Sequence, residues 1–224
     1  MKKIFLITAI ILSTAFDTMA QTSMRNIFAQ LPDNILPFLT RNNRLDCIDF
    51  IENGMEARVK NVFDDNVVLN VLTEDYLSID ISEGTTVEMK MLMGEKDTII
   101  CVNRIYKGPA EDSEVRLYNL SWHMLSRVDR PSVSEFIKLP QPAETVSVHE
   151  QDTLAMLRAE AEVLPLIKAS LSPQNTDLCW TLQSAEFSKD LKKVAERYLQ
   201  PVVMRLEPWK SEPKADVRRG QSQK

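Results

Sequence analysis

Residues 77–93, LSIDISEGTTVEMKMLM, alternate apolar and polar side chains on either side of the turn signal Glu83-Gly84. A period of two places successive side chains on opposite faces of a β-strand, so both halves of this stretch are predicted to be strands. The apolar side chains of the two halves gather on one face: Leu77, Ile79, Ile81, Val87, Met89 and Met91. Because an apolar sheet face must be buried, the stretch predicts a sheet that is covered on that side.

Strand-like runs continue on both sides of this hairpin. Short polar turns separate four further runs, at residues 57–63, 67–72, 98–107 and 114–120. Strands joined by such short connections pair in antiparallel order, because a parallel pair needs a crossover of about a dozen residues or more. The middle of the chain therefore predicts an antiparallel β-meander.

Helical segments precede the meander and are its predicted cover. Ser23 can cap a first helix that stops at Pro32, and residues 34–39 are expected to form a second short piece. A longer helix is expected at residues 42–53, followed by Gly54 as the left-handed residue that commonly ends a helix. Its apolar side chains share one arc, which should pack on the sheet: Cys47, Ile48, Phe50, Ile51 and Met55.

The last third of the chain predicts a smaller α+β unit. Residues 121–150 are expected to be a connection with one edge strand at 133–139. A helix, a hairpin, a second helix and a strand should follow, with the helices starting at Asp152 or Thr153 and at Ser188, the hairpin at 166–182 and the strand at 202–206.

The predicted fold is α+β: an antiparallel meander covered by N-terminal helices at 21–120, then a helix-hairpin-helix-strand unit at 151–209. The sequence leaves open whether this second unit is a separate domain or extends the same sheet. A polar tail at 210–224 is expected to be disordered.

The N-terminus predicts a cleavable export signal. Lys2 and Lys3 precede an apolar run at residues 4–15, and small residues lead to Ala20 before Gln21. This order is typical of a secretory signal, so cleavage is expected between Ala20 and Gln21. The mature protein is then predicted to be periplasmic or secreted, without a stable membrane span. An uncleaved anchor helix is the alternative, although polar residues interrupt the apolar run early.

The charge balance argues against nucleic acid as a partner. The chain has 27 Lys and Arg against 32 Asp and Glu, a formal net charge of −5. A phosphate backbone is bound by concentrated basic residues, whereas the basic residues here are scattered among acids. We therefore expect no nucleic acid partner.

Three cysteines, Cys47, Cys101 and Cys179, are widely separated and form neither a CxxC motif nor a metal-binding spacing. We expect them to be small buried side chains. A disulfide between Cys101 and Cys179 is the open alternative, because exported proteins meet an oxidising compartment.

Most catalytic signatures are absent from the chain. It has no GxSxG elbow, no HExxH motif and no phosphate-binding glycine loop, and its only histidines are His123 and His149. We therefore expect no cofactor and no metal site, and the sequence assigns no catalytic residue.

Four residues are candidates for ligand binding. Trp122 and His123 follow the last predicted strand, and an aromatic ring beside a titratable group can bind a sugar or a peptide. A tryptophan that closes one end of the core is the alternative. Asp46 and Asp49 share one face of the 42–53 helix, where paired carboxylates can divide acid and base roles or simply form a solvated face.

Several short motifs resemble one known family. They are MRNIF at 24–28, LPD at 31–33, LPFLT at 36–40, NNRLD at 42–46, IDF at 48–50, LTEDYLS at 72–78 and Ser121-Trp122. In these motifs the chain resembles an uncharacterised exported family of Bacteroidales, domain of unknown function 3256. The resemblance implies a Gram-negative envelope setting and no assigned activity, and it supplies no catalytic residue.

The leading hypothesis is a non-catalytic exported module of the bacterial cell envelope that binds an envelope protein, a peptide or a glycan. One alternative is a carboxylate-dependent hydrolase acting on an envelope polymer or glycan, which requires a deep pocket around Asp46 and Asp49. The other is a structural envelope component, which would assemble into a complex without a small ligand.

Overall fold

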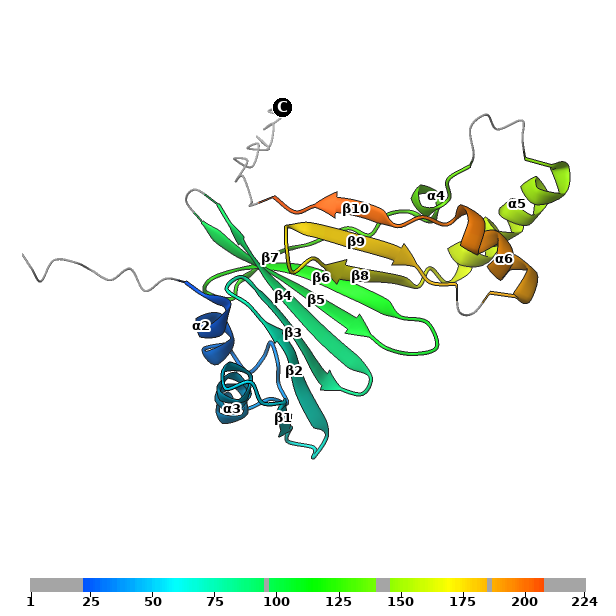
Figure 1. The fold of residues 1–224 in the computed structure, drawn as a ribbon. Coiled ribbons are helices and arrows are strands. Elements are labelled where there is room, and N and C mark those ends of the chain that lie inside the picture. Colours follow the sequence, from blue (N-terminus) through cyan, green and yellow to red (C-terminus); the bar gives the residue numbers. More distant parts are fainter. Residues whose placement is uncertain (1–21, 95–96, 140–145, 185–186, 208–224) are drawn as a thin grey trace, which may run out of the picture.

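The computed structural model describes residues 22–94, 97–139, 146–184 and 187–207 (Figure 1). The predicted signal peptide with its cleavage site lies outside these residues, as does the predicted disordered tail. Two helices come first, α2 (Met24–Ala29) and α3 (Arg41–Glu52). Strands β1 to β7 follow: β1 (Ala57–Lys60), β2 (Asn66–Leu72), β3 (Tyr76–Ser82), β4 (Thr85–Met93), β5 (Thr98–Tyr106), β6 (Asp112–Asn119) and β7 (Met124–Arg127). The last third contains α4 (Val133–Phe136), α5 (Val148–Val163), β8 (Ile167–Leu171), β9 (Asp177–Leu182), α6 (Lys189–Tyr198) and β10 (Val202–Arg205).

Strands β1 to β7 form one antiparallel sheet in chain order, with β1 at one edge and β7 at the other. The register pairs Leu77 with Met89 and Ile79 with Val87, so the apolar side chains of the 77–93 hairpin share one face. The predicted antiparallel meander is confirmed. It has one strand more than expected, because β7 lies in the stretch that the sequence pattern indicates as a connection.

Helices α2 and α3 lie against the apolar face of this sheet (Figure 1). Their buried side chains form one core with those of the strands: Met24, Phe28, Cys47 and Ile48 from the helices, and Leu77, Ile79, Val87, Met89 and Met91 from the sheet. Burial of each large apolar side chain contributes about 1.5–3 kcal/mol. The predicted cover is therefore confirmed, and this core is the physical reason for the alternation in the hairpin.

The segment between the two helices forms turns, so the helical piece expected at residues 34–39 is wrong. Pro37 has no N–H to donate and disfavours helical geometry at the residue before it. Arg44 of α3 is only 2% exposed and donates to the carbonyl oxygens of Leu31 (2.7 Å) and Leu39 (2.6 Å). A buried guanidinium thus binds carbonyl groups at both ends of this segment.

Helix α3 ends next to Gly54, whose φ of 69° is left-handed as the sequence predicts. An added Cβ at Gly54 would meet no heavy atom within 4 Å. We expect Gly54→Ala to lower the free energy of unfolding by about 1 kcal/mol, because the backbone conformation and not a clash opposes the side chain. Urea denaturation measures the loss. Gly84→Ala is the control, since Gly84 lacks a positive φ, and an equal loss in both variants would contradict the strain at Gly54.

A smaller sheet, in the order β10-β9-β8, covers the other face of the large sheet (Figure 1). The Ala169 N–H donates to Ser113 Oγ (2.9 Å), and Asn103 Nδ2 donates to the Ala169 carbonyl oxygen (2.9 Å). The Leu171 N–H donates to the Glu88 carboxylate (2.8 Å). Strand β8 therefore lies on the face of the meander, and the second unit does not extend the edge of its sheet.

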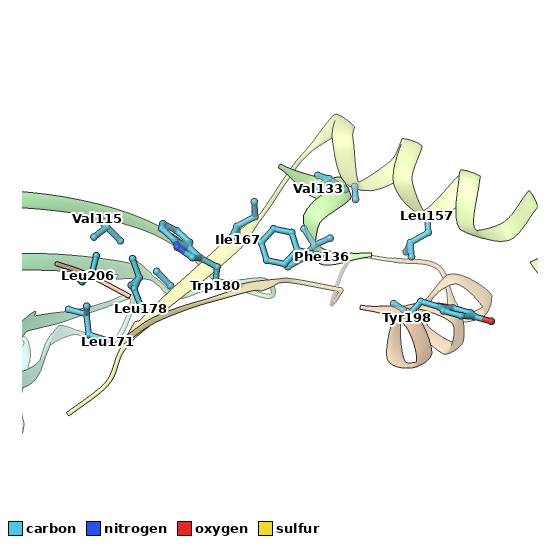
Figure 2. Close-up of a cluster of buried hydrophobic side chains, with 14 of the residues drawn as sticks. Val115, Val133, Phe136, Leu157, Ile167, Leu171, Leu178, Trp180, Tyr198 and Leu206 are labelled. Carbon is cyan, nitrogen blue, oxygen red and sulfur yellow. The ribbon is translucent and has the colours of Figure 1, made fainter. Parts of the chain in front are cut away.

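Apolar side chains fill the space between the two sheets (Figure 2). The cluster joins Val115 of the large sheet to Ile167, Leu178 and Trp180 of the small sheet and to Phe136 of α4. Leu157 of α5 and Tyr198 of α6 continue the same cluster. The second unit therefore shares its core with the large sheet.

The edge strand expected at residues 133–139 is wrong, because Val133–Phe136 is helix α4. Ser132 and Glu135 form a capping box, in which the Ser132 N–H donates to the Glu135 carboxylate (2.8 Å). This S-x-x-E pattern is the signal that identifies the helix start.

Helix α5 also begins with a capping box, formed by Ser147 and Glu150. Its cap is Ser147 and not Asp152 or Thr153, so the helix begins earlier than the sequence predicts. The predicted hairpin, the helix capped by Ser188 and the final strand are confirmed.

All three cysteines are free thiols. Cys47 and Cys101 are buried as expected, and burial raises the pKa of Cys47 to about 12 and also raises the pKa of Cys101. Cys179 is half-buried, because the alternation of β9 turns its buried neighbours Leu178 and Trp180 toward the large sheet and Cys179 toward the other face. Cys179 and Cys101 therefore do not face each other.

Candidate functional site

The two carboxylates selected from the sequence, Asp46 and Asp49, are exposed on α3. The helix packs on β1 and β2, and its buried side chains include Cys47 and Ile48. Acid–base catalysis by a carboxylate pair needs two different environments, whereas both of these side chains lie in open solvent. Their exposure does not favour the hydrolase hypothesis, which requires a deep pocket around them.

Trp122 and His123 lie in the turn between β6 and β7, at the sheet edge opposite to β1. His123 is exposed, whereas Trp122 is half-buried against Tyr118, with ring centroids 5.8 Å apart and ring planes at 55°. This pair therefore lies near the β7 edge of the sheet. Asp46 and Asp49 lie on α3, which packs on β1 and β2 near the opposite edge. Trp122 both packs on the core and remains accessible to solvent.

The backbone of Trp122 has a φ of 61°, which is unfavourable for a bulky side chain. Asn119 holds this conformation, because its Oδ1 accepts from the N–H groups of Ser121 (3.0 Å) and His123 (2.9 Å). The Trp122 N–H in turn donates to the Asn119 carbonyl oxygen (2.9 Å). Backbone strain of this kind is often found at functional positions. Here the hydrogen bonds of Asn119 hold the strained backbone, and the indole lies beside Tyr118.

A small groove of about 50 Å³ lies beside Tyr118. Its floor consists of Val102 and Arg104 from β5 with Glu114, Arg116 and Tyr118 from β6, and its wall consists of Asn34 and Ile35. We call these seven residues the arginine groove. The register places its members side by side, because Arg104 pairs with Glu114 and Val102 with Arg116. A cavity of this size admits one small polar group rather than a whole ligand.

The arginine groove carries an excess of positive charge in an acidic protein. Arg116 Nη2 donates to both Glu114 oxygens (2.8 and 2.7 Å), and Arg127 of β7 lies 3.4 Å from the same carboxylate. These contacts with Glu114 raise the pKa of Arg116, which keeps its charge. Arg104 Nη2 donates to the Ile35 carbonyl oxygen (2.9 Å). Two guanidinium groups, those of Arg116 and Arg127, therefore share one carboxylate, and Arg104 adds a third positive charge to the groove.

Two donors in the arginine groove have no hydrogen-bond partner within the described part of the chain. They are the Nε atoms of Arg104 and Arg116, both of which are buried. An unpaired buried donor costs about 1–3 kcal/mol, and a ligand that accepts from it recovers this cost. The groove can therefore bind an acceptor, and its charge favours an anionic one.

Sequence reasoning selected Trp122 but missed Arg104 and Arg116. Each arginine continues a run of alternate residues that faces the apolar core, after Ile100 and Val102 in β5 and before Tyr118 in β6. A charged residue at a core-facing position is the signal that indicates an unusual site. Their pairing depends on cross-strand register, and the wall at Asn34 depends on a loop far away in the sequence.

Exposed apolar side chains precede and follow Trp122 along the chain. Met124, which pairs directly with Tyr118, is 52% exposed, and its neighbours Leu120 and Leu125 are 46% and 42% exposed. The charged arginine groove is therefore followed along the sheet by exposed apolar side chains at the β6–β7 turn and in β7.

A second cavity, of about 220 Å³, lies beside α5 and is lined mainly by apolar side chains such as Leu139 and Leu154. It has no counterpart to the paired charges of the arginine groove. Across the described ranges, no three His, Cys, Asp or Glu side chains are arranged to hold a metal ion. Of the helices in those ranges, none is both long and apolar enough to cross a membrane.

Comparison with known proteins gives the fold but no activity. A family model described as "Protein of unknown function (DUF3256)" matches residues 15–211. The solved structure of a domain of an uncharacterized protein from Porphyromonas gingivalis W83 is similar, with a TM-score of 0.64 and 22% sequence identity. The match covers 81% of this chain and 92% of that chain. No curated protein matches the chain.

Proposed function

The chain belongs to DUF3256, a family of proteins of unknown function, and from this premise we propose that it is a non-catalytic binding module. The module is exported to the cell envelope of a Bacteroidales bacterium, where it is periplasmic or secreted. Its ligand is an envelope protein, a peptide or a glycan. Export is supported by the charged start, the apolar run and the small residues before Gln21.

One observation carries the proposed binding role: a strained aromatic residue lies next to a groove that has unpaired buried donors. Trp122 is held at a positive φ beside Tyr118, and Arg104 and Arg116 each keep a buried Nε without a partner within the described residues. Strain and unpaired donors both cost stability, so neither is expected to persist at one place without a role. A bound ligand that accepts from the donors recovers their cost, and the turn that holds Trp122 keeps its indole beside the groove.

The proposal is tested by asking whether the protein retains an envelope component and whether this retention depends on the groove. We expect the immobilised mature protein, residues 21–224, to retain a component of native envelope fractions. Arg116→Gln should reduce its affinity at least about tenfold, which corresponds to about 1.4 kcal/mol and to the loss of one charged hydrogen bond. Quantitative pull-down with titrated bait measures this change.

Arg58→Gln is the matched control, because Arg58 is an exposed arginine on β1, at the opposite edge of the sheet. It should retain as much of the component as the unchanged protein, and circular dichroism should show both variants folded. If the Arg116→Gln variant retains as much of the component as the unchanged protein, the result favours the alternative in which this protein is a structural envelope component. That result, or no retained component at all, refutes the proposed binding role.

A further inference from the structure

The charges that face the arginine groove leave a net positive excess. Arg116 and Arg127 pair with Glu114, Arg104 lies opposite Glu114 in the sheet register, and Asp112, two residues before Glu114 in β6, is paired with Arg130 (2.9 Å). Asn34 and Tyr118 complete the polar lining with an amide and a hydroxyl group. The groove is therefore complementary to a single anionic group.

The geometry of the groove suits a carboxylate. Arginine offers a planar fork of donors that matches the two oxygens of a carboxylate, and Arg104 and Arg116 both line this groove. The cavity of about 50 Å³ admits one such group. Larger parts of a ligand must lie outside the groove, along the β6–β7 edge.

The surroundings of the groove favour a peptide over a sugar. Exposed apolar side chains lie within three residues of Trp122 in the chain, namely Leu120, Met124 and Leu125, whereas a glycan needs many polar partners for its hydroxyl groups. In addition, β7 is the last strand of the sheet and has no strand on its outer side among the described residues, so an extended peptide can pair with its main chain there.

We infer that the groove binds an acidic peptide segment of a partner protein. An Asp or Glu carboxylate enters between Arg104 and Arg116, and a neighbouring apolar side chain packs on Met124 and Trp122. This inference rests on the proposed binding role and narrows it to one class of ligand.

Two matched pentapeptides test the inference: acetyl-Leu-Glu-Leu-Glu-Leu-amide and the same peptide with Gln in place of Glu. Nuclear magnetic resonance of the ¹⁵N-labelled mature protein follows the backbone amides of Arg104, Arg116, Trp122 and Met124. We expect the Glu peptide to shift these amides and the Gln peptide to bind at least about tenfold more weakly, since a charged hydrogen bond is lost. Equal binding of the two peptides overturns the inference.

Two variants give effects of opposite sign that a merely structural role does not produce. Arg116→Gln should weaken the Glu peptide about tenfold, whereas Glu114→Gln should tighten it about threefold, because it removes the only carboxylate that competes in the groove. Arg58→Gln should leave the affinity unchanged. Weaker binding in both groove variants overturns the inference.

Trigalacturonate, a short acidic sugar, is the third probe. If it shifts the groove amides and the Glu peptide does not, the ligand is an acidic glycan: the acidic-peptide inference falls and the binding role stands. If the pull-down finds no groove-dependent component, the binding role itself falls. The two failures are therefore distinguishable.

Discussion

Trp180→Ala is expected to lower the free energy of unfolding by about 3–5 kcal/mol, the usual cost of removing a buried tryptophan from a core. Trp180 is 0% exposed and lies with Ile167 and Leu178 in the cluster that joins the two sheets (Figure 2). Its removal leaves a cavity between β9 and the large sheet that the rigid strands cannot close. Urea denaturation followed by circular dichroism measures the loss.

Two further variants separate packing from other causes. Cys179→Ala changes the next residue on the opposite face of β9 and should cost less than about 1 kcal/mol, in line with its partial exposure. Trp180→Phe should cost less than the alanine variant, because the Trp180 Nε1 has no hydrogen-bond partner within the described residues and the change breaks no bond. If Trp180→Ala and Cys179→Ala cost the same, the shared core between the sheets is contradicted.

The sequence predicts the large sheet well because the signal is local. In residues 77–93 the period of two and a single turn identify both strands, their pairing and their apolar face. Gly54 likewise marks a helix end through its own backbone preference. The capping boxes at Ser132 and Ser147 are equally local, so helix α4, wrongly predicted as a strand, and the earlier start of α5 were both predictable from the residues present.

The parts of the fold that the sequence does not predict depend on long-range contacts. Alternation places Glu88 and Lys90 on the polar face of β4 but does not say that a second sheet covers this face. Lys90 is only 1% exposed, pairs with Asp75 (2.7 Å) and donates to the carbonyl oxygen of Pro173, a residue 83 positions away. No local pattern contains this information, because it depends on where the last third of the chain folds back.

The residues of the candidate site also differ in whether their signal in the sequence is local or depends on distant parts of the chain. Trp122 attracts attention in the sequence because an aromatic residue follows a strand, but its strained φ depends on the Asn119 turn. Arg104 and Arg116 lie 12 positions apart and become neighbours through the register of β5 and β6. Asp46 and Asp49, which the helical period brings together, remain exposed.

Glu88→Ala is expected to lower the free energy of unfolding by about 3–4 kcal/mol, because it leaves several buried donors unpaired. One carboxylate oxygen accepts from Asn103 Nδ2 (2.9 Å) and from the Leu171 N–H (2.8 Å). The other accepts from the Tyr76 hydroxyl (3.2 Å), and burial raises the pKa of Tyr76, so this hydroxyl stays a donor. Glu88 therefore ties the large sheet to the small one.

Urea denaturation measures the total loss, and Glu83→Ala is the control because Glu83 is exposed in the turn of the same hairpin. The control should stay within about 0.5 kcal/mol of the unchanged protein. Hydrogen exchange then locates the effect. The Leu171 amide should exchange faster in Glu88→Ala, whereas the Ala169 amide, which donates to Ser113, should change less. If both variants are equally stable, or if Leu171 keeps its protection, Glu88 acts inside the meander and does not hold the sheets together.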